Sequence, residues 1–147
     1  MAPFGWPRAT SIVLGMAAAI AIAAPAALGQ SSVKAIYEKY RLLGTFAIDC
    51  YQPASKQNFY YVNRLLDDGR VQSDVMSGAT TRDFVVFIDK AEVRKAGEIA
   101  LSGTREGKPV SMVWRVEADR LMSLQRVAEG KEYGGGGRWV YRCGAPG

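Results

Sequence analysis

The chain has 147 residues, a formal net charge of +5 at pH 7 and no histidine. The absence of histidine excludes serine–histidine–acid catalysis, cysteine–histidine catalysis and imidazole metal sites. Basic residues are interleaved with Asp and Glu and form no basic run. The charge therefore indicates solubility, and we expect no nucleic-acid partner.

The N-terminal segment is typical of a signal peptide. Residues 1–8 contain one basic residue and no acid, and residues 11–28 are almost entirely apolar or small. The pattern Ala27-Leu28-Gly29 predicts cleavage before Gln30. Pro25 and the high alanine content argue against a bilayer span, although an uncleaved anchor is the alternative. We therefore expect a periplasmic or secreted protein with no stable membrane insertion after cleavage.

Removal of residues 1–29 would leave residues 30–147, or 118 of the 147 residues. That length suits a single domain with one hydrophobic core. Cys50 and Cys143 both lie in this part, and an even cysteine count in an oxidising compartment predicts a disulfide. Free thiols or an intermolecular bridge are the alternatives. Two thiols without histidine supply at most half of a tetrahedral metal shell, so we expect no metal and no other cofactor.

A short amphipathic helix is predicted at the start of the mature chain. Apolar residues recur at three- and four-residue spacing between Val33 and Leu43, and Ser31 or Ser32 can cap the first turn. Gly44 stands where a C′ glycine would end the helix. Such a helix most simply lies over its own domain, and binding a membrane or a partner is the alternative.

From Thr45 onward the apolar period changes from helical to two, which predicts strands. Eight segments have this pattern: residues 45–51, 59–66, 71–76, 83–89, 98–104, 110–117, 121–128 and 138–143. Asp67-Asp68-Gly69 predicts a hairpin turn, residues 90–97 a charged connection and residues 134–137 a flexible glycine tip. Residues 83–89 are apolar on both faces, so they lie in the middle of the fold or expose one face to a ligand or partner.

The order of these segments predicts an all-β fold. Short strands joined by tight turns are typical of an antiparallel meander, which at this length closes into a barrel or splits into two packed sheets. A disulfide between the first and last strands favours a single up-and-down barrel of about eight strands, because those strands are neighbours when a barrel closes. A β-sandwich is the alternative.

The helix, the Gly44-Thr45-Phe46 triplet, the antiparallel strands and a basic residue in the last strand together resemble the lipocalin-like branch of the calycin barrels. In that family a Gly-x-Trp motif opens the first strand, and a late arginine packs over the tryptophan ring. Here Phe46 stands where the tryptophan is expected, and Arg138 or Arg142 would be the packing cation. The resemblance implies the barrel fold more than it implies a ligand.

The carboxylates do not form a converging acid–base pair. Asp67 and Asp68 are explained by the hairpin turn, and Asp83 and Asp89 lie at opposite ends of one strand, roughly 20 Å apart. The glycine run lacks the Lys-Ser/Thr that follows a phosphate-binding loop. We therefore predict no catalytic residue and no enzymatic activity.

Large side chains share one parity of several predicted strands. An eight-stranded barrel is just wide enough either to be filled by such side chains or to hold one small ligand. The candidate ligand-binding residues are Phe59, Tyr61, Phe84, Met112, Trp114 and Trp139. They predict a module that binds a small apolar or amphipathic ligand. The alternative is a non-catalytic interaction, inhibitor or envelope-structural protein with a filled core.

Arginines within the predicted strands offer a second kind of contact. Arg64, Arg115 and Arg142 each lie inside a strand, where an inward side chain could read an anion. An outward orientation toward water is the simpler expectation for all three.

Overall fold

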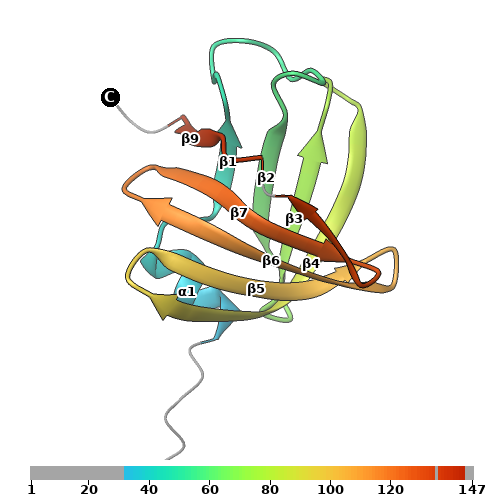
Figure 1. The fold of residues 1–147 in the computed structure, drawn as a ribbon. Coiled ribbons are helices and arrows are strands. Elements are labelled where there is room, and N and C mark those ends of the chain that lie inside the picture. The colour runs from blue at the N-terminus through green and yellow to red at the C-terminus, as the bar shows by residue number, and fades with distance from the viewer. Residues whose placement is uncertain (1–31, 135, 145–147) are drawn as a thin grey trace, which may run out of the picture.

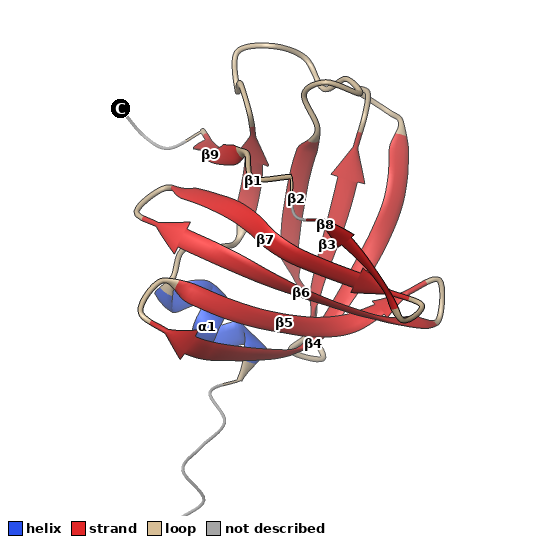
Figure 2. Ribbon diagram, viewed as in Figure 1, coloured by secondary structure: helices blue, strands red, loops and turns tan. Residues whose placement is uncertain are grey.

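The computed structural model describes residues 32–134 and 136–144, so the predicted signal peptide lies outside the described residues. One short helix and nine strands make up this part of the chain (Figures 1 and 2). Their bounds are α1 Val33–Lys39, β1 Gly44–Ala47, β2 Tyr60–Leu65, β3 Val71–Met76, β4 Arg82–Lys95, β5 Glu98–Arg105, β6 Lys108–Glu117, β7 Arg120–Ala128, β8 Lys131–Gly134 and β9 Trp139–Cys143. Within the described residues, no helix combines the length and the hydropathy that crossing a bilayer requires.

Eight of the strands form a closed antiparallel barrel. Each strand from β1 to β7 pairs with the next along the chain. β9 closes the ring, because it pairs with β1 on one side and with the start of β7 on the other. The predicted fold class and the adjacency of the first and last strands are therefore confirmed. β8 is an additional strand that pairs with the second half of β7.

Two strands differ from the sequence-based expectation. Residues 90–97 are not a connection, because β4 continues through Lys95. Ala91 and Val93 pair with Leu101 and Ile99 of β5, so the charged residues between them face outward. Apolar and charged residues that alternate form a strand with one face toward solvent. The number of charges in residues 90–97 suggested a connection, but their alternation indicates a strand. The second difference is β8, a strand that was not predicted and that ends at Gly134, the first residue of the predicted glycine tip.

The helix and the first strand are shorter than predicted. The Ser32 side chain accepts a hydrogen bond from the Ala35 N–H at 3.1 Å, as expected of an N-cap. The helix nevertheless ends at Lys39, not at Leu43, because Arg41 adopts a left-handed φ of 54° and Leu42 turns into the core. β1 ends at Ala47, and residues 48–59 form a loop before β2. The remaining strand ends lie within two residues of those predicted.

α1 covers one end of the barrel, which we call the covered end. Ile36 and Tyr37 are buried there, and the Tyr37 ring lies 6.3 Å from the ring of Trp114 in β6. β1 leads away from α1 to the loop of residues 48–59, which lies at the opposite end (Figure 1). We call that opposite end the open end.

Arg142 links β9 to the covered end. Its guanidinium lies 5.1 Å from the centroid of the Phe46 ring, and its Nη1 donates to the Leu43 carbonyl at 2.8 Å. Its Nε lies 3.6 Å from the Asp119 carboxylate. Burial, and then the neighbouring Arg41, lower the pKa of the Arg142 guanidinium, while Asp119 opposes this shift. Of the two candidate cations in the last strand, Arg142 is the one that packs over Phe46.

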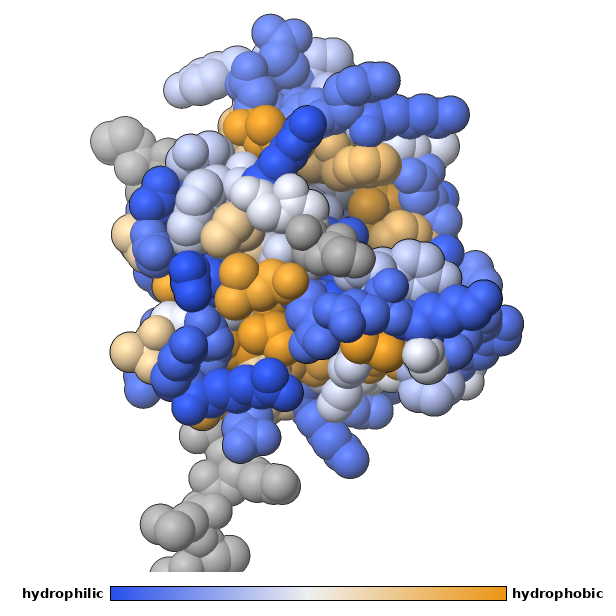
Figure 3. Space-filling model, in the orientation of Figure 1, coloured by the Kyte–Doolittle hydropathy of each residue, from blue (hydrophilic) through white to orange (hydrophobic). Residues whose placement is uncertain are grey.

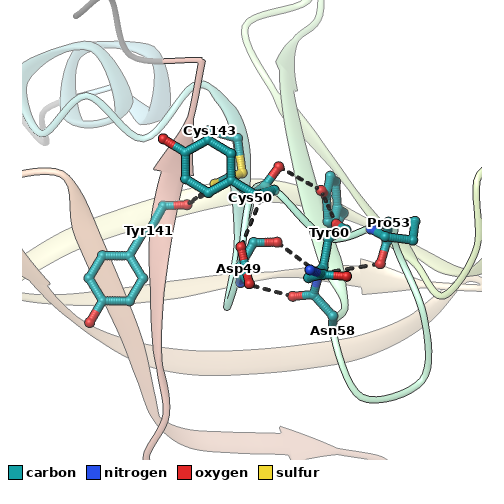
Figure 4. The surroundings of a disulfide bond; sticks show 9 residues. Asp49, Cys50, Pro53, Asn58, Tyr60, Tyr141 and Cys143 are labelled. Carbon is teal, nitrogen blue, oxygen red and sulfur yellow. Dashed lines mark hydrogen bonds between the residues drawn. A yellow bond between two sulfur atoms is a disulfide. The ribbon is translucent and has the colours of Figure 1, made fainter.

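The Cys50–Cys143 disulfide is present, and its two Cα atoms are 5.3 Å apart (Figure 4). It lies where β9 pairs with β1 over only three residues on each strand. Next to the disulfide, the Asn58 amide donates to the Asp49 carbonyl at 2.8 Å, and the Asp49 N–H donates to Asn58 Oδ1 at 3.0 Å. The disulfide therefore reinforces a short seam of the barrel and holds one end of an internally bonded loop.

A close backbone approach accompanies the bend of β4 toward β5. The β4–β5 register shifts between Ile88 and Lys90, directly beside Gly103 of β5. A Cβ atom at Gly103 would lie 1.8 Å from the Phe87 carbonyl oxygen. Only glycine fits here, and the bend helps the long strand β4 to curve around the barrel.

Candidate functional site

A cavity of about 470 Å³ lies at the open end of the barrel. Its floor is made of three buried apolar side chains, Trp114 of β6, Leu121 of β7 and Val140 of β9. Exposed Lys56 and Arg138 stand at its rim, from the β1–β2 loop and from the approach to β9. The cavity thus has an apolar floor, with the buried Ser123 and the half-buried Arg126 also in its lining, and it is cationic at its mouth.

Three of the six predicted ligand-binding residues are brought together in this cavity. Phe59, Tyr61 and Trp114 all line it. They come from the residue before β2, from β2 and from β6, which are far apart in the sequence and meet because the barrel closes. The alternate strand positions that include Tyr61 and Trp114 therefore face the interior of the barrel, as predicted.

The other three predicted residues lie elsewhere. The Arg105 guanidinium lies 4.1 Å from the centroid of the Phe84 ring, away from the cavity lining. Met112 lines a different hollow, between α1 and the strands β4 to β6. Trp139 is half-buried, with the Arg120 guanidinium 4.3 Å from the centroid of its ring. Val140 takes the inward position in β9, so its neighbour Trp139 must face outward. Contrary to the prediction, Trp139 therefore does not line the cavity.

Arg126 was not among the predicted residues, yet it lines the cavity from β7. Strict alternation along β7 would place Arg126 on the face opposite to Ser123. The β6–β7 register pairs Trp114 with Ser123 but Val113 with Gln125, so Leu124 is an extra residue in a bulge. A bulge reverses the parity of the later residues in its strand, and Ser123 and Arg126 therefore both face inward. No signal in the sequence marks this bulge.

Arg126 forms a polar cluster across the cavity. Its Nη2 donates to the Tyr61 hydroxyl at 3.0 Å, and its Nε donates to Ser123 Oγ at 2.9 Å. β2 and β7 are not neighbours in the sheet, so the bond from Arg126 to Tyr61 crosses the barrel. Arg126 is half-buried, and both of its hydrogen-bond acceptors are neutral hydroxyl groups.

The charges around this cavity are all of one sign. Its described lining contains Lys56, Arg126 and Arg138 and no Asp or Glu. None of these three takes part in the ion pairs found among the described residues. By contrast, Arg64 is paired with Asp74 and Arg115 with Glu98, both on the outside of the barrel as expected. The cavity therefore holds positive charge that the described residues do not compensate.

A second hollow, of about 710 Å³, lies between α1 and the strands β4 to β6. It is lined by side chains of both signs, including Asp89, Lys90, Glu92 and Arg94. Its charge is balanced, so it favours no class of ligand in the way that the open-end cavity does. Among residues 32–134 and 136–144, no group of three or more His, Cys, Asp or Glu side chains could hold a metal ion.

The outer surface over β5 to β7 is mixed. Apolar surface appears between the strands and is bordered by hydrophilic side chains (Figure 3). Ala100 and the buried Val113, which both line the second hollow, are cross-strand partners on β5 and β6, and Val113 pairs on its other side with the polar Gln125. Apolar residues on this face are thus interrupted by polar ones.

Comparison with protein-family models, with curated proteins and with solved structures finds no match.

Proposed function

We propose that this protein is an exported, lipocalin-like binding module that takes a small apolar or amphipathic molecule into the open end of its barrel. The observation that carries the proposal is the cavity of about 470 Å³ with Trp114, Leu121 and Val140 at its floor. Small-molecule sites typically have volumes of about 300 to 1,000 Å³, mostly apolar walls and a few polar groups. The volume of this cavity lies in that range, and its apolar floor is combined with polar and cationic groups along the wall and rim.

Three further observations support the lipocalin-like type. Gly44 opens β1, and the ring of Phe46 two residues later lies under the Arg142 guanidinium at 5.1 Å. The resemblance implies the same arrangement, with tryptophan in place of Phe46. The short helix that covers the barrel end next to this pair is a third common feature.

Export is supported by the disulfide and by the N-terminal segment. Disulfides persist in oxidising compartments such as the periplasm, and Cys50 and Cys143 are paired in the structure. The apolar run of residues 11–28 with the Ala27-Leu28-Gly29 pattern is typical of a cleaved signal.

Tryptophan fluorescence tests the proposal, because Trp114 lies at the cavity floor. The mature chain contains two tryptophans, so the Trp139→Phe variant reports on Trp114 alone. We expect saturable fluorescence changes when this variant is titrated with a panel of medium-chain alcohols, fatty acids and small aromatic compounds. Absence of a saturable change with every member of the panel would contradict the proposal.

A matched pair of variants locates the binding. Ser123 is buried and lines the cavity, whereas Ser111 on β6 is exposed and lines the second hollow instead. Ser123→Leu fills part of the cavity and should weaken binding at least tenfold, whereas Ser111→Leu should leave it within twofold. Equal effects of the two variants would place the ligand outside the cavity.

The alternative function, an interaction or envelope-structural protein, requires a filled core. The open-end cavity weighs in favour of ligand binding over this alternative. The polar interruptions on the face of β5 to β7 also give a partner protein less continuous apolar surface to cover.

A further inference from the structure

We infer that the ligand is an amphipathic monocarboxylate, held by its carboxylate at Arg126 and Tyr61. This inference rests on the proposed function and adds the charge, the polar group and the orientation of the ligand. It starts from the one inward arginine at the open end that lacks an acidic partner among the described residues.

Arg126 has hydrogen-bond donors to spare. A guanidinium carries five N–H groups in a planar fork, and the contacts to Tyr61 and Ser123 use two of them. Among the described residues, the remaining three have no acceptor. The fork matches the two oxygens of a carboxylate, and charge-assisted bonds of this kind are roughly twice as strong as neutral ones.

Tyr61 supplies a second donor at the same point. Its hydroxyl oxygen accepts the bond from Arg126, so its own hydrogen is directed elsewhere. A carboxylate oxygen beside Arg126 would receive this hydrogen as well. The bond from Arg126 to Tyr61 thus orients both groups before a ligand arrives, which reduces the ordering cost of binding.

Removing a charge from water is costly unless it is paired, and most of the partly buried charges among the described residues are paired. Arg142, the inward arginine at the covered end, has the Leu43 carbonyl and Asp119. The buried Asp74 has both Arg64 and Arg82. Arg105 and Arg126 are the two half-buried charges in no ion pair among the described residues, but Arg105 lies over the Phe84 ring while Arg126 lines the cavity. An anionic ligand in the cavity would supply the missing counter-charge of Arg126.

The rest of the cavity selects an organic anion over an inorganic one. Lys56 and Arg138 at the rim attract an anion toward the mouth. The floor of Trp114, Leu121 and Val140 then offers apolar surface that a sulfate or phosphate ion would leave uncovered. An alkyl or aryl carboxylate can contact the cationic groups with its carboxylate and the apolar floor with its hydrocarbon part.

Three probes with the same tail test the charge: decanoate, decanol and decyltrimethylammonium, each titrated against the Trp139→Phe variant at low salt. We expect decanoate to bind at least tenfold more tightly than decanol and the cation to bind most weakly. Arg126→Gln should weaken decanoate binding at least tenfold and change decanol binding less than twofold. Arg115→Gln, on the outside of the barrel, is the matched control and should change neither.

The outcomes separate the two proposals. If decanol and decanoate bind equally, or Arg126→Gln weakens both equally, the carboxylate assignment is wrong while the binding module stands. If none of the three probes binds, the carboxylate assignment is wrong, and the binding module fails too if the wider panel of alcohols, fatty acids and aromatic compounds also gives no saturable change. If equimolar sulfate displaces decanoate, the site recognises any anion and the carboxylate assignment is again wrong. If Arg126→Gln does not fold, Tyr61→Phe takes its place, with an expected threefold or greater loss for decanoate alone.

Discussion

Arg142 and Arg126 both turn into the barrel, Arg142 at the covered end and Arg126 at the open end. Each lies near an aromatic ring, with the guanidinium 5.1 Å from the centroid of Phe46 for Arg142 and 6.0 Å from the centroid of Tyr61 for Arg126. Phe46 and Tyr61 are themselves cross-strand partners on β1 and β2. The two arginine–aromatic pairs are therefore built on neighbouring positions of one sheet.

Their partners differ. Arg142 donates to the Leu43 carbonyl and lies near the carboxylate of Asp119, so it joins α1, β1 and β9 into one packed end. Arg126 has only two neutral hydroxyls. The same residue type thus contributes to stability where its partners lie within the chain and remains available for binding where they do not. Incomplete local satisfaction is typical of functional sites.

The disulfide should have the largest effect on stability, because it crosses the seam on which both ends depend. β9 is held by three paired residues on each side, against eight in the β5–β6 ladder. We expect Cys50→Ala with Cys143→Ala to lower the free energy of unfolding by about 2 to 5 kcal/mol, measured by urea denaturation. A loss below about 0.5 kcal/mol would show that β9 is held without the disulfide.

Paired arginine variants test the comparison directly. Arg142→Met leaves the Leu43 carbonyl without its donor, so we expect the free energy of unfolding to fall by about 2 to 3 kcal/mol. Arg126→Met frees only two hydroxyls next to the open cavity, where water can reach them, and should change stability by less than about 0.5 kcal/mol. Urea denaturation of both variants at neutral pH measures the difference. Equal losses would mean that Arg126, like Arg142, is a structural residue.

Tyr37 at the covered end should give the smallest effect. Its hydroxyl is fully buried and has no hydrogen-bond partner among the described residues. Tyr37→Phe removes this unpaired group and should raise the free energy of unfolding by up to about 1 kcal/mol at pH 7. A loss of stability would indicate an ordered water molecule bonded to the hydroxyl.

The same variant should alter the response to alkali. Burial raises the pKa of the Tyr37 hydroxyl far above its ordinary value of about 10, so only the unfolded chain ionises there at moderately alkaline pH. Ionisation of Tyr37 in the unfolded chain therefore leaves the free energy of unfolding unchanged below pH 10 and lowers it as the pH rises further. We therefore expect the free energy of unfolding to fall less steeply above pH 10 in Tyr37→Phe than in the wild type, as measured by urea denaturation across that range.

Local patterns were sufficient for much of the fold. Alternation located the barrel strands, and the Asp67-Asp68-Gly69 turn and the 71–76 strand agree with the structure. The end of a strand was mispredicted where charged residues suggested a connection, as in the second half of β4. Three of the six candidate residues line the cavity. Tyr61 and Trp114 are among them because both lie in regular parts of their strands, where the alternation read from the sequence correctly gives the inward side.

Composition and the two-residue period of apolar side chains thus determined the fold class, since strand formation depends on short-range chemistry. The cysteine count determined the Cys50–Cys143 pairing, since two cysteines allow only one intramolecular pair. Only the tertiary structure decided which side chains meet inside. The bulge at Leu124 reverses the parity of β7 and turns Arg126 inward, while β9 presents Val140 and leaves Trp139 outside. One unpaired residue in a ladder changes which face every later side chain takes, and that residue is chosen by packing between strands that are distant in the sequence.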